Sequence, residues 1–227
     1  MNILIVYAHH EPSSFTAALK NVTIEALQTP ENSVKISDLY GQGFSAIAAN
    51  YDFVVSSGNH FNYMLEQKNA VQHELAFSPD IKDELQRVKE ADLIIFHFPI
   101  WWFSVPAILK GWFDRVLVMG AAWDGHGQRY ERGMLLGKKA LVIATASGSA
   151  EMYQKEGVHK ATISEVLHPV LHGTLAFCGM DVLQPYIVYD ILQKTDEERV
   201  QILELYRQHI SGVPTNPSYY SRYETTV

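Results

Sequence analysis

Three short segments of this 227-residue chain carry side chains suited to binding a flat, negatively charged molecule. The first begins at His9 and places the hydroxyl residues Ser13, Ser14 and Thr16 at the start of a predicted helix. Hydroxyl donors beside the unpaired N–H groups of a first helical turn, together with the helix dipole, form an anion site suited to phosphate. The alternative interpretation is an ordinary serine cap of the helix.

The second segment, residues 99–106, places Trp101, Trp102 and Phe103 directly after an apolar run. These rings could stack on or enclose a conjugated ring, and the backbone amides of Trp102 and Phe103 could bind its heteroatoms. The alternative is that the rings complete the core or a dimer interface.

The third segment, residues 145–153, contains Ser147 and Gly148, small residues that let the backbone approach a planar ligand closely. Alone it is a weak signal, because many such loops have no function. A phosphate grip, an aromatic wall and a polar backbone edge in one place describe a flavin site better than any one of them does.

The elements that would bring these segments together follow from hydrophobic patterning. Short apolar runs, typical of strands buried on both faces, occupy residues 3–8, 93–98, 140–145 and 182–189, with a weaker fifth at 34–39. Helical patterns fall between them, at residues 15–26, 80–91, 106–119 and 161–178, and a last helix opens at the capping box from Thr195 to Glu198.

Alternating strands and helices predict a doubly wound α/β fold. Five strands indicate a flavodoxin-like parallel sheet in the order 2-1-3-4-5, with the ligand beyond strands 1 and 3. No G-x-G-x-x-G follows the first strand, which argues against NAD as the only bound nucleotide. We predict one flavin-binding domain at residues 1–212. The aromatic-rich insertion at about 41–79 and the C-terminal tail at 213–227 are interpreted as dimer arms.

The composition excludes several classes of function. A net charge of −7 argues against a nucleic-acid binder, which needs clustered Lys and Arg. The single cysteine, Cys178, excludes an internal disulfide and is interpreted as a small core residue. No run of 18 apolar residues exists, so membrane insertion is not expected. The opening residues are typical of a strand and not of a signal peptide, and a reducing, cytoplasmic compartment is predicted.

At the same residues the sequence resembles the NAD(P)H:quinone oxidoreductases of mammals and their bacterial relatives. The likeness covers about residues 2–210. It is strongest in residues 91–96, which read ADLIIF, in Trp102 and Phe103, and in residues 105–113, which read VPAILKGWF. The resemblance implies a homodimer with one flavin at each subunit interface. It also implies ping-pong hydride transfer from NAD(P)H as co-substrate to the flavin, and then to a quinone.

The resemblance also assigns residues to the flavin. The phosphate and adenosine side falls on His9, Ser14, Phe15 and Thr16, and the isoalloxazine on Pro99, Ile100, Trp101, Trp102, Phe103, Thr145, Ala146, Ser147 and Gly148. Asn62 would reach in from the partner subunit. Ile191, Arg199 and Leu203 match contacts of an adenine end, which favours FAD over FMN.

Tyr153 and His159 match the pair that supports charge on the flavin, and we predict them as the catalytic residues. A tyrosine hydroxyl can donate to an oxygen of the ring, and an imidazole can hold or release a proton near neutral pH. The predicted substrate contacts are Trp102, Phe103, Asp124, His126, Gly148, Met152, His159 and Phe177.

Some positions depart from the family pattern and keep alternatives open. Residues 145–148 read TASG where the family has two threonines and two glycines, and the substrate-capping tyrosines fall near Asp124 and His126. Residues 123–127 look more like the ancillary proteins of potassium efflux antiporters, many of which bind FMN. A regulatory subunit of such a transporter is therefore an alternative function, and FMN an alternative cofactor. A one-electron flavodoxin and an azo- or nitroreductase are further alternatives.

Two histidine pairs are also considered. His9 and His10 point opposite ways if the strand continues through them, so only one would face the ligand. His168 and His172 lie four apart on a helix, a spacing that could serve a metal, but no third ligand is evident and no metal is predicted.

Overall fold

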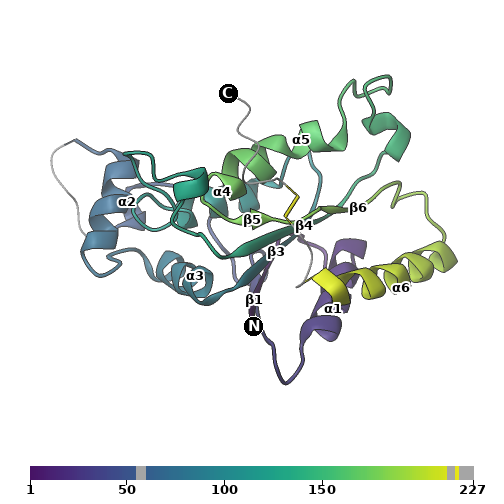
Figure 1. Ribbon diagram of the computed structural model, residues 1–227, viewed down its shortest axis with the longest axis horizontal. Coiled ribbons are helices and arrows are strands. Elements are labelled where there is room, and N and C mark those ends of the chain that lie inside the picture. Colours follow the sequence, from purple (N-terminus) through teal and green to yellow (C-terminus); the bar gives the residue numbers. More distant parts are fainter. Residues whose placement is uncertain (55–59, 214–217, 220–227) are drawn as a thin grey trace.

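The structure is a computed structural model, and it describes residues 1–54, 60–213 and 218–219. Its centre is a parallel sheet in the order β2 (Ser33–Asp38), β1 (Asn2–Tyr7), β3 (Leu93–Pro99), β4 (Lys139–Thr145) and β5 (Asp181–Val182) (Figure 1). A further strand, β6 (Tyr186–Val188), also pairs with β4. The predicted flavodoxin-like order 2-1-3-4-5 is confirmed.

The last predicted strand, residues 182–189, is not continuous. β5 pairs with the start of β4, at Lys139 and Ala140, and β6 pairs with its end. Between them lies Pro185, which has no N–H to give to a ladder, so the ladder is interrupted there. The sheet therefore has six strands where the sequence predicted five.

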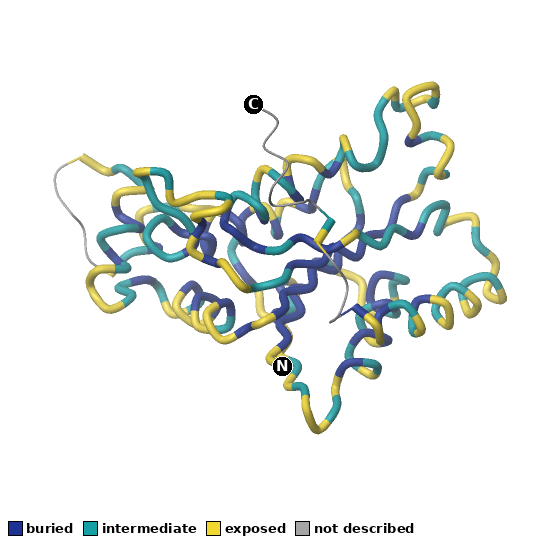
Figure 2. Tube along the Cα trace, viewed as in Figure 1, coloured by how far each residue is buried: buried dark blue, intermediate teal, exposed yellow. Residues whose placement is uncertain are grey.

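Helices cover both faces of the sheet. α1 (Phe15–Leu27) and α6 (Asp196–Gly212) pack on one face, over Ile3 and Ile5 of β1. α3 (Pro79–Glu90), α4 (Ala107–Val116) and α5 (Ile163–Val170) lie on the other, over Leu4 and Val6. The strands form the buried core along the middle of the molecule (Figure 2). None of the helices within the described residues is long and apolar enough to cross a membrane.

The helix termini follow local chemistry. Thr195 and Glu198 form the predicted capping box of α6. The predicted helix 161–178 is α5 followed by a π-helix at Leu171–Ala176, and Pro169 lies just before the change. A proline removes one backbone donor from the ladder, which is a common cause of such irregularities. Short 3₁₀ turns occur at Asn50–Asp52, Tyr130–Arg132 and Ala150–Tyr153 (η3).

The predicted arm contains a helix that the sequence did not reveal, α2 (Tyr63–Gln72), capped by the side chain of Asn62. The arm is fixed to its own subunit by a buried arginine of α4. Arg115 contacts Asp52 (Nη2 to Oδ1, 2.8 Å) and Asp80 (Nη1 to Oδ2, 2.8 Å), and the Tyr63 hydroxyl donates to Asp52 at 2.6 Å. Its role as a dimer arm stays a prediction, and residues 55–59 of it lie outside the described part.

Two residues of the C-terminal tail are described. Ser218 pairs with Leu183 in an antiparallel bridge, and the N–H of Tyr219 donates to the carbonyl of Val182 at 2.6 Å. They therefore lie along the β5 edge of their own chain. The rest of the predicted tail after Val213 lies outside the described residues, and its role as a dimer arm stays a prediction.

Candidate active site at the carboxyl ends of β1, β3 and β4

The loop after β1 prepares the start of α1. Ser14 is the N-cap residue, and its Oγ accepts from the N–H of Ala17 at 3.2 Å. Thr16 is buried, and its Oγ1 lies 3.0 Å from the Oγ1 of Thr145 at the end of β4. The predicted phosphate loop and the predicted isoalloxazine loop are therefore joined by one hydroxyl–hydroxyl hydrogen bond.

His9 and His10 do not point opposite ways, because β1 ends at Tyr7 and the condition for that expectation, a strand that continues through them, is not met. Their rings stack with centroids 4.9 Å apart, and both contact Trp101 at about 6 Å. The chain has left the extended conformation here, and the N–H of Glu11 donates to the His9 Nδ1 at 3.0 Å. Burial, and secondly the neighbouring His10, lower the pKa of His9, which favours a neutral imidazole.

The loop after β3 is a two-residue turn with an unusual backbone. Trp101 and Ser104 exchange both backbone hydrogen bonds at 3.0 Å, and the residues between them, Trp102 and Phe103, have φ values of 49° and 60°. Bulky residues rarely adopt this left-handed region, and such conformations cluster at functional sites. The Trp102 side chain is 95% exposed, so it does not complete the core.

The loop after β4 is held close to the predicted catalytic pair. A Cβ on Gly148 would lie 3.2 Å from the Sδ of Met152, 3.4 Å from the Tyr153 ring and 3.6 Å from the Nε2 of His159. A side chain here would occupy the space beside the pair, which explains the glycine. The carbonyl of Gly148 accepts from the N–H of Asp190 at 3.1 Å.

Tyr153 and His159 lie together, as the resemblance implied. Their ring centroids are 4.7 Å apart, and Phe103 meets the His159 ring edge-on at 4.9 Å. The turn after β3 and the loop after β4 therefore meet at this histidine. Burial raises the pKa of Tyr153, so its hydroxyl stays protonated and can donate.

The predicted adenine end lies at the start of α6. Arg199 donates from Nη2 to the carbonyl of Ile191 at 3.3 Å, and Leu203 lies one helical turn further on, half-buried. The Nε of Arg199 is buried and has no acceptor among the described residues, so this N–H group could donate to a ligand.

The chain is similar in sequence to known proteins. A family model described as "Flavodoxin-like fold" matches residues 1–210. The mouse protein named Ribosyldihydronicotinamide dehydrogenase [quinone] is 44% identical over 213 residues, covering 93% of this chain and 91% of the relative. The rat protein named NAD(P)H dehydrogenase [quinone] 1 is 40% identical over 221 residues, covering 96% and 80%. The chain belongs to the NAD(P)H:quinone oxidoreductase family.

Solved structures agree. A Klebsiella pneumoniae protein assigned as a quinone reductase superposes with a TM-score of 0.90 at 34% identity, covering 96% of this chain and 86% of the other. An NAD(P)H:quinone oxidoreductase from Methanothermobacter marburgensis gives a TM-score of 0.71 at 25% identity, covering 95% and 98%. The family consists of flavin-dependent quinone reductases. This chain has the same flavodoxin-like fold, in both its sheet and its helices.

The residues present fit a flavin. Trp102 of the turn after β3 presents an exposed indole, Gly148 has no side chain to crowd Tyr153, and the Nε of Arg199 has no acceptor among the described residues. The indole could pack against the flavin ring, the Gly148 loop could contact the polar edge of the ring, and Arg199 could bind the nucleotide end.

The remaining predicted substrate residues, Asp124, His126 and Phe177, lie in a second region of the chain. Phe177 stacks edge-on against Trp123 at 5.7 Å, and both line a cavity of about 390 Å³ with Tyr63 and Phe113. That volume is within the usual range for small-molecule sites. Asp124 is close by and pairs with Lys68 (2.8 Å), whose hydrogen bond is the main cause that lowers the pKa of the Asp124 carboxyl.

The structure does not bring this second region to Tyr153 and His159 within one chain. Asn62 caps α2 on the arm, and His126 is exposed in the turn after Asp124. In Figure 1 the arm helix α2 lies at the left of the view, and the green segment just before α5 lies at the right. The predicted site is thus present as two halves.

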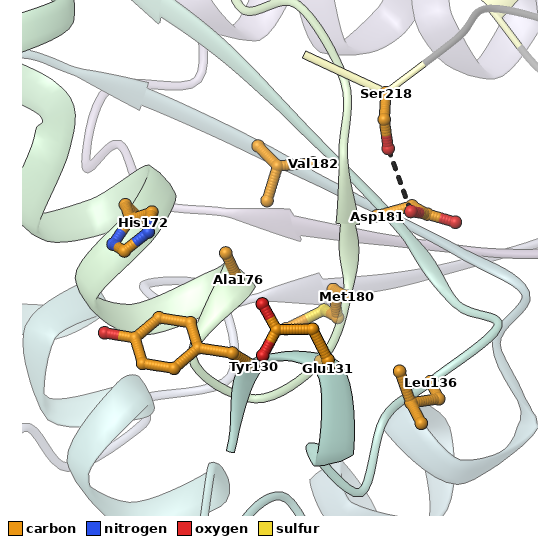
Figure 3. Close-up of a pocket in the computed structure, with 10 residues that line it drawn as sticks. Tyr130, Glu131, Leu136, His172, Ala176, Met180, Asp181, Val182 and Ser218 are labelled. Carbon is orange, nitrogen blue, oxygen red and sulfur yellow. Dashed lines mark hydrogen bonds between the residues drawn. The ribbon is translucent and has the colours of Figure 1, made fainter. Parts of the chain in front are cut away.

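A different cavity, shown in Figure 3, contains none of the predicted site residues. It is lined by Tyr130, His172 and Asp181 among others, and the hydroxyl of Ser218 donates to Asp181 there at 2.8 Å. Its volume of about 70 Å³ is well below that of a small-molecule site.

The remaining titratable residues are explained structurally. The rings of His168 and His172 stack at 4.9 Å, but the described residues contain no group of three or more His, Cys, Asp or Glu placed to hold a metal ion. Cys178 is buried, and burial raises its pKa to about 12, so it is not a nucleophile at neutral pH.

Sequence reasoning missed several residues around the site. Lys68 and Trp123 border the second half, and Tyr189, 5.8 Å from the Tyr153 ring, lies beside the first. Asp190 holds the Gly148 loop through its backbone. No sequence pattern marks a backbone contact of this kind.

Proposed function

We propose that this chain reduces quinones with two electrons from NAD(P)H, through a bound FAD, in two successive half-reactions. The class of reaction follows from the family, whose members are quinone reductases. The observation that carries the proposal is the Tyr153–His159 pair, packed against Gly148 and reached by Phe103 from the turn after β3.

The bound flavin supplies the atom that accepts and then releases hydride. The chain's residues bind and orient it: Ser14 and Thr16 at the phosphates, Trp102 and Phe103 along the ring. Arg199 would hold the adenine end, and its buried Nε, which has no acceptor among the described residues, supports FAD over FMN, which has no adenine.

Tyr153 and His159 manage protons at the polar edge of the ring. The protonated Tyr153 hydroxyl could donate a hydrogen bond to an oxygen of a bound ring, where negative charge would develop. His159 could hold a proton and give it to the reduced quinone, which would leave as the quinol. Because the His159 Nε2 lies beside Gly148, both groups act at the same edge.

A second copy of the chain completes the site in this proposal. The Phe177 half and the Tyr153 half do not meet in one subunit, so quinone would be held between subunits, with Asn62 reaching the partner's flavin. Exposed apolar side chains on the arm support a self-association surface; they include Ile47, Tyr51, Val54 and Met64. Sedimentation equilibrium that gave only a monomer with bound flavin would contradict this part.

The electron donor can be tested directly. Relatives of this chain carry names for both NAD(P)H and ribosyl dihydronicotinamide, so rates with NADH, NADPH and dihydronicotinamide riboside should be compared at fixed quinone. The alternative role as a regulatory subunit of a potassium efflux antiporter stays a prediction, and co-purification with a membrane antiporter would test it.

The decisive experiment has two steps. Heat release of the cofactor followed by mass measurement should give FAD. His159→Gln should then slow flavin reduction in stopped flow by about 10²–10⁴-fold, the usual contribution of acid–base help. The control is His168→Gln, an exposed histidine away from the site, which should keep the rate. Colourless protein that binds neither flavin, or an unchanged rate in His159→Gln, would contradict the proposal.

A further inference from the structure

The loop after β4 is held in place by residues 188–191, here named the 188–191 strap, in which Ile191 has a predicted role at the adenine end and Asp190 has none. The strap begins at the last residue of β6 and makes three backbone hydrogen bonds to the loop. The carbonyl of Val188 accepts from Ala146 at 2.8 Å, the N–H of Ile191 donates to the carbonyl of Ala146 at 3.3 Å, and the N–H of Asp190 donates to Gly148 at 3.1 Å. The loop is thus fixed at both Ala146 and Gly148.

Asp190 gives the strap its shape. Its φ of 54° is in the left-handed region, which aspartate, asparagine and glycine adopt more readily than other residues. The bend at Asp190 turns two consecutive N–H groups, its own and that of Ile191, toward the same loop. Within the described residues its carboxylate takes part in no hydrogen bond or ion pair, so the backbone makes the contact.

A cavity of about 320 Å³ lies beside the strap, lined by Ala150 and Glu151 of the loop after β4 and by Tyr189, Asp190 and Lys194 among others. The far end of the strap is tied to α6, since Arg199 donates to the carbonyl of Ile191 at 3.3 Å. The strap therefore links the arginine of the proposed adenine end to the loop at the proposed ring end.

The inner side of the loop has little room. A Cβ added at Gly148 would lie only 3.2–3.6 Å from atoms of Met152, Tyr153 and His159. Displacement of the Gly148 carbonyl by a fraction of an ångström would change where the ring sits relative to that pair.

We propose that Asp190 is a positioning residue of the flavin site: its left-handed backbone sets the Ala146–Gly148 loop against Tyr153 and His159 and couples that loop to Arg199. Asp190 acts through its backbone and does not touch the reacting atoms. The inference rests on the proposed function, because it assumes a flavin at this loop.

The test compares substitutions that differ in their tolerance of a left-handed backbone. Asp190→Gly and Asp190→Asn adopt it easily, Asp190→Ala does so with strain, and Asp190→Val is the most strained, since β-branched residues are outliers there. For each we would measure the dissociation constant for FAD, the midpoint potential of the bound flavin, and the stopped-flow rate of its reduction.

We expect Gly and Asn to resemble the wild type in all three measurements. Ala and then Val should bind FAD progressively more weakly and show a shifted potential. Their reduction rates should fall by as much as about 100-fold, the scale on which a 1 Å misplacement acts. Ala keeps the test decisive if the Val variant does not fold.

The matched control is Gly137→Val, at a remote turn before β4 where φ is +85° and the space is open. It should lower the melting temperature without moving the flavin potential or the reduction rate. Unchanged flavin properties in Asp190→Ala and Asp190→Val would overturn the inference. So would equal losses in Gly, Asn and Val, because the carboxylate would then be the active group.

Different results would exclude the proposed function and the role of Asp190. A wild-type protein that binds no flavin removes the proposed function. A wild type that binds and reduces flavin normally, with Asp190 variants that all behave alike, removes only the role of Asp190.

Discussion

The two halves of the site are held together by different forces. Around Tyr153 and His159 the loops are joined by neutral contacts: the Thr16–Thr145 hydroxyl pair and the backbone hydrogen bonds of the 188–191 strap. The arm, which carries Asn62, is fixed by charges, with Arg115 between Asp52 and Asp80. Neutral contacts add no charge near the flavin ring, Tyr153 and His159. In the arm, ion pairs fix the orientation of the segment, but burying their charges costs desolvation free energy.

The largest expected effect comes from breaking the charged half. Arg115→Met removes a cation whose side chain is 2% exposed and leaves the fully buried Asp52 carboxylate unpaired. Loss of one partner of a buried pair costs about 3–5 kcal/mol of the free energy of unfolding. Urea unfolding of the flavin-loaded protein measures it.

Lys35→Met is the matched comparison, since it breaks an exposed pair with Glu90 at 2.6 Å. Exposed pairs contribute about 1 kcal/mol or less. Equal losses in the Arg115 and Lys35 variants would show that the arm is not held by its buried charges.

A smaller effect is expected in the neutral half. Thr145→Val keeps the shape of the side chain but leaves the buried Thr16 hydroxyl without this partner. An unsatisfied buried hydroxyl costs about 1–3 kcal/mol. Thermal unfolding of the flavin-free protein measures this loss, and isothermal titration with FAD should show weaker binding. Serine at 145 retains the hydroxyl and should restore both.

The smallest expected effect is a pH dependence of the free energy of unfolding, caused by a buried histidine of β3. His97 is fully buried on β3, and burial lowers its pKa to about 3, so the folded protein keeps it neutral. The unfolded chain binds a proton at His97 below about pH 6.5, so stability falls as the pH drops from there toward 3. At pH 5.5 the loss is about 1.4 kcal/mol for this group.

His97→Leu should remove that part of the slope between pH 7 and pH 5.5 in urea unfolding. Thr23, which contacts the imidazole at 3.2 Å, keeps its bonds to Leu19 and Tyr206 in the variant, so no donor is stranded. An identical slope in both proteins would show that His97 is protonated in the fold or exposed by local opening.

The sequence predicts the sheet well because buried parallel strands are continuous apolar runs. It places the three loops at the carboxyl edge, and the comparisons confirm the family, whereas the roles of Tyr153 and His159 stay predictions. The break at Pro185 is missed because the apolar residues on either side, Val182 and Leu183 before it and Tyr186–Val188 after it, are read together as one run, although a proline is itself a signal for an interrupted strand. The sequence also misses α2, whose exposed Met64 and Leu65 obscure a helical stripe.

The left-handed residues and the charged anchors are invisible for a physical reason. Trp102 and Phe103 have side chains that disfavour their backbone conformation, so propensity argues against what the fold imposes. Asp52 and Arg115 are 63 residues apart, and no local pattern joins them. Such features depend on tertiary contacts that a single sequence does not display.

The position of β1 has a consequence for how the protein is made. β1 is synthesised before β2 and β3, yet in the sheet it lies between them, with Ile3 opposite Leu93. Its second edge therefore stays unpaired until about ninety further residues have been synthesised, and pairings of such separation form slowly. During this stage of synthesis the apolar strand has an unpaired edge, which makes the nascent chain prone to aggregation and a substrate for chaperones.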